Sequence, residues 1–287
     1  MNKLLRIAGF VVVALGLSVA TSVRAEGPFG QMISPVSNPV NFEDPRINTE
    51  VRPIFVHHVI DDKFVTQGGD VNIYALQLRV AATDRLAIIA TKDGFVDLNP
   101  NAVVPEDTGL ANIAAGVKYA FYMDPAAGMI GTAGIRYEIP TGDEEVLQGN
   151  GDGILNTFGS FGMTCDRFNI IAGTGLRIPA DDADSMFWDF DAHIDTKIDR
   201  VSPLLELNLV HVLSAGKRLP IPDEGQDFFN IGSSGSDGET MLTAAAGARV
   251  ELAKDVSLGA AYQFPLITGA GTRITDWRLT ADLIVSF

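Results

Sequence analysis

Apolar residues alternate with small or polar ones over segments of about ten residues, and this pattern constrains the fold more than any other feature. In 277–287 one set of alternate positions is Trp, Leu, Ala, Leu, Val and Phe, whereas the other includes Arg278, Thr280 and Asp282. Successive side chains of a β-strand point to opposite faces, so one face suits lipid or a core and the other suits water. About twelve segments follow this pattern, at 49–60, 70–82, 85–96, 109–123, 128–140, 153–164, 167–179, 185–199, 201–213, 240–253, 256–266 and 273–287.

The connections between these segments predict how the strands close. Short joints at 83–84, 124–127, 165–166, 200 and 254–255 alternate with longer, Gly- and acid-rich connections at 61–69, 97–108, 141–152, 180–184, 214–239 and 267–272. Bacterial outer-membrane barrels have an even number of antiparallel strands, short periplasmic turns and longer exterior loops. The sequence therefore predicts an all-β fold, a closed antiparallel transmembrane β-barrel of about twelve strands.

Aromatic residues fit the same strand directions. Those expected near the exterior rim are Tyr74, Tyr137, Trp188, Tyr262 and Trp277, and those expected near the periplasmic rim are Phe121, Phe161, Phe168 and Phe287. Two aromatic girdles are typical of a transmembrane barrel. A secreted soluble β-sandwich or barrel would also alternate, but its outward face would be polar rather than rich in Leu, Ala and aromatic residues.

The first 25 residues have the features of a cleavable secretory signal peptide. Lys3 and Arg6 precede an apolar run at 7–20, and Val23-Arg24-Ala25 fits the small-x-small cleavage pattern. No later window reaches the roughly 18 consecutive apolar residues that a spanning helix needs. We expect a signal peptide at 1–25, a Pro-rich N-terminal segment at 26–47 and an outer-membrane β-barrel at 48–287, exported to the outer membrane of a Gram-negative cell.

Charge and cysteine content exclude several classes of protein. The formal net charge is −15 and no window forms a basic stripe, so a nucleic-acid partner is not expected. With 46% hydrophobic residues and 20% charged ones, the chain is not intrinsically disordered. The single cysteine, Cys165, excludes an internal disulfide and a Cys-cluster metal site, and we expect it to be a small buried residue or a free thiol beside a turn rather than a redox centre.

The Pro-rich segment 26–47 has two possible placements. Its prolines at 28, 35, 39 and 45 argue against a regular helix or a central strand. It is either a loose periplasmic tail or a plug folded back into the lumen. The plug is suggested by apolar residues that a solvated tail would not need, namely Phe29, Met32, Ile33, Val36, Val40 and Phe42.

The densest polar constellation lies on one face of the segment 187–198. Asp189, Asp191, His193 and Asp195 share that face, and Glu206 follows on the next strand. Carboxylates held near a His can activate water or hold a divalent cation. An inward charge ladder is also what a water-filled barrel shows, and Lys118, Arg136, Arg249 and Arg278 are expected to balance it from other inward faces. We expect these nine residues to line the lumen and set selectivity, with no catalytic residue and no metal ligand among them.

A family resemblance adds a class of cargo. The stretch 109–121, GLANIAAGVKYAF, followed by Tyr137-Glu-Ile-Pro-Thr-Gly-Asp143 and a Gly-rich loop, resembles the outer-membrane protein family labelled MetA-pathway of phenol degradation. The resemblance covers about 49–287 and is strongest over 109–165. It implies a barrel that admits small, often aromatic or hydrophobic, compounds, and it supplies no catalytic residue.

The sequence thus predicts an outer-membrane channel or transporter for passive passage of small molecules, with no cofactor. The expected partners are outer-membrane lipid, a small-molecule solute and the barrel-assembly machinery, which would read the C-terminal strand ending at Phe287. Two rival functions stay open: a barrel hydrolase using the Asp/His cluster, and a structural or adhesive barrel with a closed lumen. The run 149–153, GNGDG, could bind calcium but lacks the full spacing of a known calcium loop, so a flexible exterior loop is the preferred interpretation.

Overall fold

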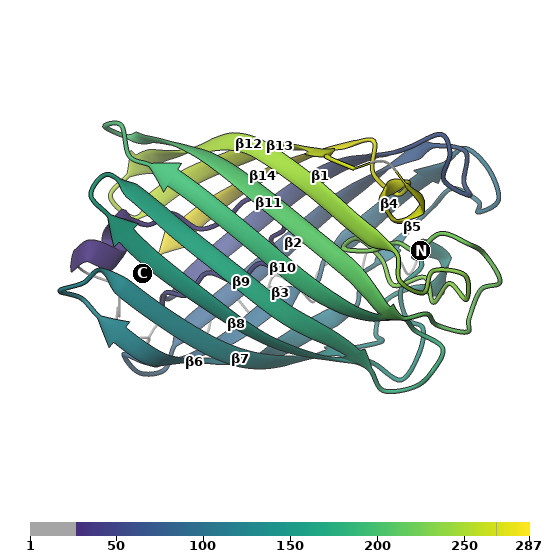
Figure 1. Cartoon of the computed structure of the whole chain (residues 1–287), viewed down its shortest axis with the longest axis horizontal. Helices are drawn as coiled ribbons and strands as arrows, with labels where there is room; N and C mark the ends of the chain where they lie inside the picture. The colour runs from purple at the N-terminus through teal and green to yellow at the C-terminus, as the bar shows by residue number, and fades with distance from the viewer. Residues whose placement is uncertain (1–26, 268) are drawn as a thin grey trace, which may run out of the picture.

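The computed structural model describes residues 27–267 and 269–287 and is built almost entirely from β-strands (Figure 1). The strands are β1 (Glu50–Ile60), β2 (Gly69–Ala81), β3 (Leu86–Lys92), β4 (Phe95–Pro100), β5 (Asp107–Leu110), β6 (Ile113–Asp124), β7 (Met129–Ile139), β8 (Ile154–Cys165), β9 (Phe168–Pro179), β10 (Met186–Thr196), β11 (Val201–Ser214), β12 (Thr240–Ala253), β13 (Val256–Pro265) and β14 (Trp277–Ser286). Three short 3-10 turns accompany them, η2 (Gly27–Gln31), η3 (Glu144–Val146) and η4 (Ala270–Thr272). In this part of the chain no helix is long and apolar enough to cross a membrane.

Every strand pairs antiparallel with its neighbours, and the sheet closes on itself. β1 pairs with β2 on one side and with β14 on the other, in a register that matches Glu50 with Ser286 and Val59 with Trp277. This closure joins the two sides of the sheet, so the ladder satisfies most backbone N–H and C=O groups of the wall; within the described residues the short β5 is paired on one side only, with β4. The tilted strands form one elongated barrel (Figure 1).

The fourteen strands form a barrel of twelve staves, where a stave is one crossing of the barrel wall from end to end. The numbers differ because two staves are each interrupted and so consist of two strands, β3 with β4 and β5 with β6. β3 and β4 pair with opposite ends of β2, and β5 and β6 pair with β4 and β3 respectively. The first interruption falls at Asp93-Gly94, where Gly94 has φ +128° and a Cβ would lie 2.6 Å from the carbonyl oxygen of Tyr74. Only glycine fits a position with this backbone and this close approach.

The predicted twelve staves are confirmed, and their ends differ in a few places. The stave predicted at 85–96 continues as β4 to Pro100, and that predicted at 109–123 begins earlier, at Asp107. The connection expected at 97–108 therefore shrinks to 101–106. β14 begins at Trp277 rather than 273, because η4 occupies part of the connection before it.

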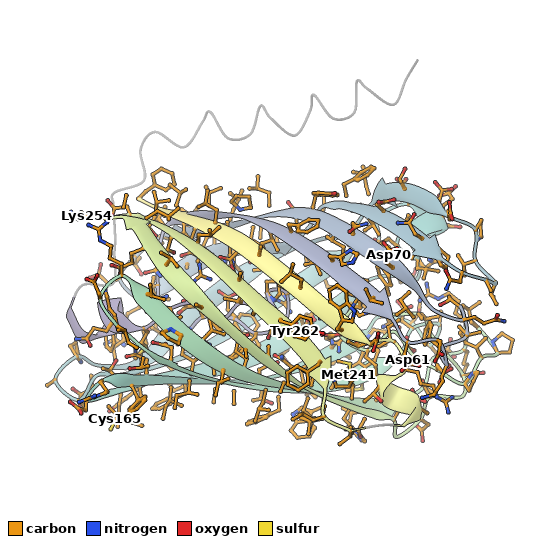
Figure 2. All side chains as sticks on the ribbon, turned by 90° about the horizontal axis from the view of Figure 1, so that it is seen from above. Asp61, Asp70, Cys165, Met241, Lys254 and Tyr262 are labelled. Atoms are coloured by element: carbon orange, nitrogen blue, oxygen red, sulfur yellow. The ribbon has the colours of Figure 1, made fainter. Side chains whose placement is uncertain are left out.

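Short and long connections lie at opposite ends of the barrel. Short turns at 82–85, 125–128, 166–167, 197–200 and 254–255 alternate with connections at 61–68, 101–106, 140–153, 180–185, 215–239 and 266–276. Figure 2 shows Cys165 and Lys254 at the end with the short turns and Asp61 toward the other end. Cys165 is a free, exposed cysteine there, so of the two expected states the free thiol is observed and the buried residue is not: the turn leaves it outside the packed wall.

The outer wall is apolar. Alternate residues of the strands are exposed and large, such as Leu205 (60% exposed) and Leu207 on β11 or Trp188 and Phe190 on β10. A soluble barrel would place polar residues here, whereas a lipid-facing wall requires these apolar ones. Seven aromatic residues of the two predicted girdles are exposed near the expected ends of their strands: Tyr137, Trp188 and Tyr262 toward the long connections, and Phe121, Phe161, Phe168 and Phe287 toward the short turns. Tyr74 is exposed nearer the middle of β2, and Trp277 is half-buried.

Candidate functional site

The nine residues that the sequence assigned to the lumen are all buried, none more than 4% exposed. Their outward neighbours on the same strands, such as Phe190 and Ile194 on β10, are exposed, so the nine side chains point into the barrel. They are Lys118 on β6, Arg136 on β7, Asp189, Asp191, His193 and Asp195 on β10, Glu206 on β11, Arg249 on β12 and Arg278 on β14.

Two groups of inward charges lie on opposite parts of the barrel wall. Arg79 on β2, Lys118 on β6 and Arg136 on β7 form the cationic side. The acidic side is on β10 and β11, which are separated from the cationic strands by β8 and β9 in one direction and by β12, β13, β14 and β1 in the other. The two groups therefore face each other across the lumen, and each also has an opposite charge beside it: Glu50 lies 3.2 Å from Arg79, and Arg177 lies 2.8 Å from Asp189.

Residues 27–47, the N-terminal segment, lie between these two sides. Most of the segment from Phe29 to Ile47 is buried, and it hydrogen-bonds to side chains of β1, β2, β6, β7, β9, β10, β11 and β12. Because these strands surround the barrel axis, the segment lies inside the ring of strands. In Figure 1 it is the dark purple stretch that begins at the end of the barrel where the chain terminates.

Glu43 is the contact of the N-terminal segment with the cationic side. Its Oε1 accepts from Lys118 Nζ at 2.7 Å and from Arg79 Nε at 2.8 Å, and its Oε2 accepts from Arg79 Nη2 at 2.7 Å. Burial alone would raise the pKa of Glu43, but the charges of Arg79 and Lys118 outweigh it and lower the pKa to about 2. Glu43 is therefore a carboxylate held by three N–H donors.

Backbone groups complete the cationic contacts. Lys118 Nζ also donates to the carbonyl oxygen of Asp44 at 2.7 Å, and Arg136 donates to the carbonyl oxygen of Val40. Gln77 Nε2 donates to the carbonyl oxygen of Pro39 at 2.7 Å. These contacts fix two parts of the segment. One is its apex at 38–40, which lies deepest in the barrel, and the other is its returning leg at 41–47, which leads back to β1.

On the acidic side the segment supplies donors rather than charges. The amide of Val36 donates to Oε1 of Glu206 at 2.8 Å and that of Ser37 donates to Oε2 at 2.7 Å. Glu206 Oε1 also lies 2.8 Å from Nδ1 of His193, whose Nε2 lies 3.0 Å from Oδ2 of Asp195. An imidazolium can donate to both carboxylates, so His193 joins them into one network.

Two further contacts extend this network along the wall. Asn38 Nδ2 donates to Oδ1 of Asp191 at 3.1 Å, and Asn169 Nδ2 bridges Oδ1 of Asp195 and the carbonyl oxygen of Gln31. The carboxylates of the predicted cluster are thus engaged by the protein itself. In the described residues no group of three His, Cys, Asp or Glu side chains is arranged to hold a metal ion.

Arg52, Arg249 and Asp282 form a third anchor, and the sequence reasoning placed only Arg249 in it. Arg249 Nη1 donates to Oδ1 of Asp282 at 2.6 Å, and Arg52 Nε donates to Oδ2 at 3.0 Å. Arg52 Nη2 also donates to the carbonyl oxygen of Pro35 at 2.6 Å. The alternation in 277–287 already placed Asp282 on the polar face, and the same rule could have found Arg52, which occupies an inward position of β1.

The connection 215–239, the long loop, enters the lumen from the opposite end. Asp227 accepts from Arg278 at both carboxylate oxygens, at 2.7 and 2.9 Å, and Phe228 stacks on His58 with ring centroids 4.2 Å apart. Arg177 Nη1 donates to the carbonyl oxygen of Gln226 at 2.7 Å while pairing with Asp189. No periodic pattern in the sequence marks Asp227, because loops have no repeating face.

A cavity of about 70 Å³ lies where the two inserted elements approach each other. Most of its lining is apolar and comes from the apex of the N-terminal segment, the long loop and the β1–β4 wall; it includes Pro39, Val40, Ile73, Val96, Phe228 and Phe229. A second, more polar cavity of about 90 Å³ adjoins the short-turn end and is lined in part by Ser34, Arg46 and Arg249. The N-terminal segment thus contributes to the walls of both spaces.

Comparison with known proteins identifies the fold. No family model matches the chain, and no curated protein sequence matches it. Among solved structures, the COG4313 outer membrane channel from Pseudomonas putida F1 superposes with a TM-score of 0.64 at 13% identity, covering 89% of this chain and 100% of that one. The NanC porin (TM-score 0.51, 9% identity, 83% and 98% covered) and the β domain of the Bordetella autotransporter BrkA (0.51, 14%, 84% and 100%) are also similar. At these identities the likeness is one of fold.

Proposed function

We propose that the protein is an outer-membrane channel for passive passage of small molecules and that the N-terminal segment is its plug. The observation that carries the proposal is the polar, charged lumen filled by a segment that the wall holds through hydrogen bonds and ion pairs. A structural barrel could close its lumen with packed apolar side chains, at no cost in buried charge. The channel fold of the Pseudomonas putida protein supports the same conclusion.

The nine predicted lumen residues would then act in two states. With the plug in place they bind its groups, as Glu206 binds the amides of Val36 and Ser37. With the plug displaced they would face solutes and set selectivity through the charges of the cationic and the acidic side. Their predicted role in selectivity is part of this proposal.

The cargo class that the family resemblance implied, small aromatic or hydrophobic compounds, is supported by the apolar cavity. Phe228 and Phe229 give it an aromatic wall, and Pro39 and Val40 of the plug close it from the other side. A compound entering from the long-connection end would meet this cavity once the long loop moves. We also propose that the chain belongs to the MetA-pathway of phenol degradation family, because the residues at 109–143 resemble those of that family.

The rival function, a barrel hydrolase using Asp189, Asp191, His193 and Asp195, is less well supported. A general base needs a free position beside the proton that it abstracts. Here His193 is held at both ring nitrogens, and Glu206 is occupied by two amides of the plug. We therefore propose a non-enzymatic role for the cluster, namely holding the plug.

The proposed location is the outer membrane of a Gram-negative cell, reached by way of the signal peptide at 1–25, which lies outside the described residues. The apolar outer wall supports a lipid partner. The barrel-assembly machinery is proposed to recognise β14 and Phe287, whose amide donates to the carbonyl oxygen of Thr49 and so ties the last residue to the start of β1.

Single-channel recording of the mature chain in planar bilayers tests the proposal. The full chain should show small or rare conductance steps, and a chain lacking 27–47 should show larger ones. Equal conductance of the two folded proteins would contradict the plug, and silence of both would favour a structural barrel.

A point variant tests the same contact without removing the segment. Glu206→Gln replaces one carboxylate oxygen with an NH2 group that cannot accept from an amide, so we expect more frequent opening. Asp166→Asn, in the exposed turn between β8 and β9, is the matched control and should behave as the unmodified chain does. Unaltered opening in Glu206→Gln would contradict this role of Glu206.

A further inference from the structure

The cationic side of the lumen has the geometry of a carboxylate-binding site. Arg79 presents Nε and Nη2 to the two oxygens of Glu43, and Lys118 adds a third donor to Oε1. The two parallel N–H···O bonds of a guanidinium are the arrangement that recognises a planar carboxylate. With the plug in place both cations are at most 2% exposed as side chains, and both project inward from β2 and β6, so the site faces the lumen rather than the outer surface.

Glu43 of the plug occupies this site, and if it left, the positive charges of Arg79 and Lys118 would lose a negative partner. Among the described residues, Arg79 forms ion pairs with Glu43 and with Glu50, the latter at 3.2 Å, whereas Lys118 forms its ion pair with Glu43. Two buried cations with a single acid are unfavourable, because a buried charge needs a partner or full hydration. When the plug moves, water or an anion must therefore replace Glu43 at Arg79 and Lys118, and only an anion supplies the missing opposite charge.

The surroundings of the site define what kind of anion would fit. Gln77, whose Oε1 accepts from Arg79 Nη1 at 3.3 Å, also lines the apolar cavity. Thr91 and Val40, both in contact with Arg136, line it as well. A compound with a carboxylate at one end and an apolar body at the other could thus place each end in a matching environment.

We propose that Arg79 and Lys118 form a binding site for a small organic carboxylate, that Glu43 occupies this site in the closed state, and that a carboxylate solute which replaces Glu43 releases the plug. This inference rests on the proposed function, because it uses the plug as the closing element. It identifies Glu43 as a built-in competitor of the solute. No covalent step is involved, since one carboxylate exchanges for another.

The binding half of the proposal is tested with Glu43→Ala, which vacates the site. In detergent micelles, sodium acetate and sodium benzoate should raise the thermal midpoint of Glu43→Ala saturably, with benzoate acting at lower concentration. Sodium chloride at equal ionic strength and acetamide at equal concentration should not. The unmodified chain should need a concentration at least about tenfold higher, since Glu43 competes. Equal effects of acetate and chloride on Glu43→Ala would overturn the site.

Tryptic cleavage after Arg46 keeps the proposal testable if Glu43→Ala does not fold. Arg46 lies in the returning leg of the plug with its side chain 11% exposed, so trypsin needs the plug to move. In the unmodified chain benzoate should accelerate this cleavage beyond what chloride does at the same ionic strength. Cleavage that follows ionic strength alone would overturn the release step.

These readouts separate the two proposals. If acetate binds Glu43→Ala but the barrel never conducts, the carboxylate site is supported and the channel function is contradicted. If the chain conducts when 27–47 is deleted, but acetate and chloride have equal effects on Glu43→Ala, the channel function is supported and the carboxylate site is contradicted.

Discussion

Arg278 on β14 and Asp227 in the long loop form a bidentate ion pair inside the barrel, with N···O distances of 2.7 and 2.9 Å. The pair fixes a loop tip that lies 51 residues away in sequence. Arg278 also donates from Nε to Nδ1 of His58 at 2.9 Å, and its guanidinium lies over the ring of Phe228. One arginine thus holds the loop by charge and by stacking, independently of the plug.

Replacing Asp227 by Asn should loosen the long loop and raise conductance. The change keeps the size of the side chain but removes the partner of a buried cation, which costs roughly 3–5 kcal/mol when such a pair is fully buried. Single-channel recording is the measurement, and Asp237→Asn, in an exposed part of the same loop, is the control. If both variants conduct like the unmodified chain, the long loop does not obstruct the pore.

Ionisation of Glu239 should loosen the long loop as the pH rises. Burial raises the pKa of Glu239 to about 7, and the nearby acids Asp223 and Glu224 act in the same direction while Arg273 opposes them. Because the folded form holds the proton more tightly than the unfolded form, whose pKa is near 4.5, the stabilisation is complete below pH 4.5 and is lost as the pH passes about 7.

Hydrogen exchange checks this pH dependence. Amides in 223–239 should exchange faster at pH 8 than at pH 6 after correction for the intrinsic rate, and Glu239→Gln should remove the difference. Asp237→Asn should retain it. Asp184, whose pKa burial raises to about 6, also titrates in the lower part of this window; it is unchanged in Glu239→Gln, so the difference between that variant and the unmodified chain isolates the contribution of Glu239. Equal pH responses of the unmodified chain and Glu239→Gln would contradict the assignment.

The native cysteine reports the orientation of the barrel. Cys165 is exposed at a short turn, the end expected in the periplasm. A thiol reagent too large to cross the outer membrane should therefore leave Cys165 unlabelled in intact cells and should label it after permeabilisation. In a Cys165→Ser background, Asp62→Cys in the connection 61–68 should show the opposite behaviour. Labelling of Cys165 in intact cells would reverse the proposed orientation.

The strands could be predicted because apolar outward side chains alternate with inward ones along the staves. On β10, Phe190 and Ile194 point outward while Asp191 and His193 point inward, as the sequence pattern requires. The grouping of His193 with Glu206 was also accessible, since the two are direct cross-strand partners. The interruption at Asp93-Gly94 was missed because a turn signal inside a stave resembles the end of one.

Contacts of the two inserted elements could not be predicted in the same way. Glu43 and Lys118 are 75 residues apart, and nothing periodic connects a Pro-rich segment to a strand face. The apolar residues of 26–47 suggested a plug, but its anchors are largely backbone groups, such as the amides of Val36 and Ser37, which have no signature in the sequence. The charged anchor Glu43 could have been suspected as a partner of the inward cation Lys118, but nothing in the sequence indicates the distance between the segment and β6.

Leu207→Arg tests whether the apolar wall faces lipid. Leu207 is exposed near the middle of β11, where a barrel strand crosses the centre of the hydrocarbon layer. An arginine at that depth should lower the free energy of unfolding by ~2–4 kcal/mol in lipid vesicles, because its charge loses hydration. Val103→Arg, in the connection 101–106, should change it by less than about 0.5 kcal/mol, since Val103 is exposed outside the staves. Denaturant titration in vesicles measures both. Equal effects of the two substitutions would mean that the middle of β11 is in water, and the barrel could not span a membrane in the register described.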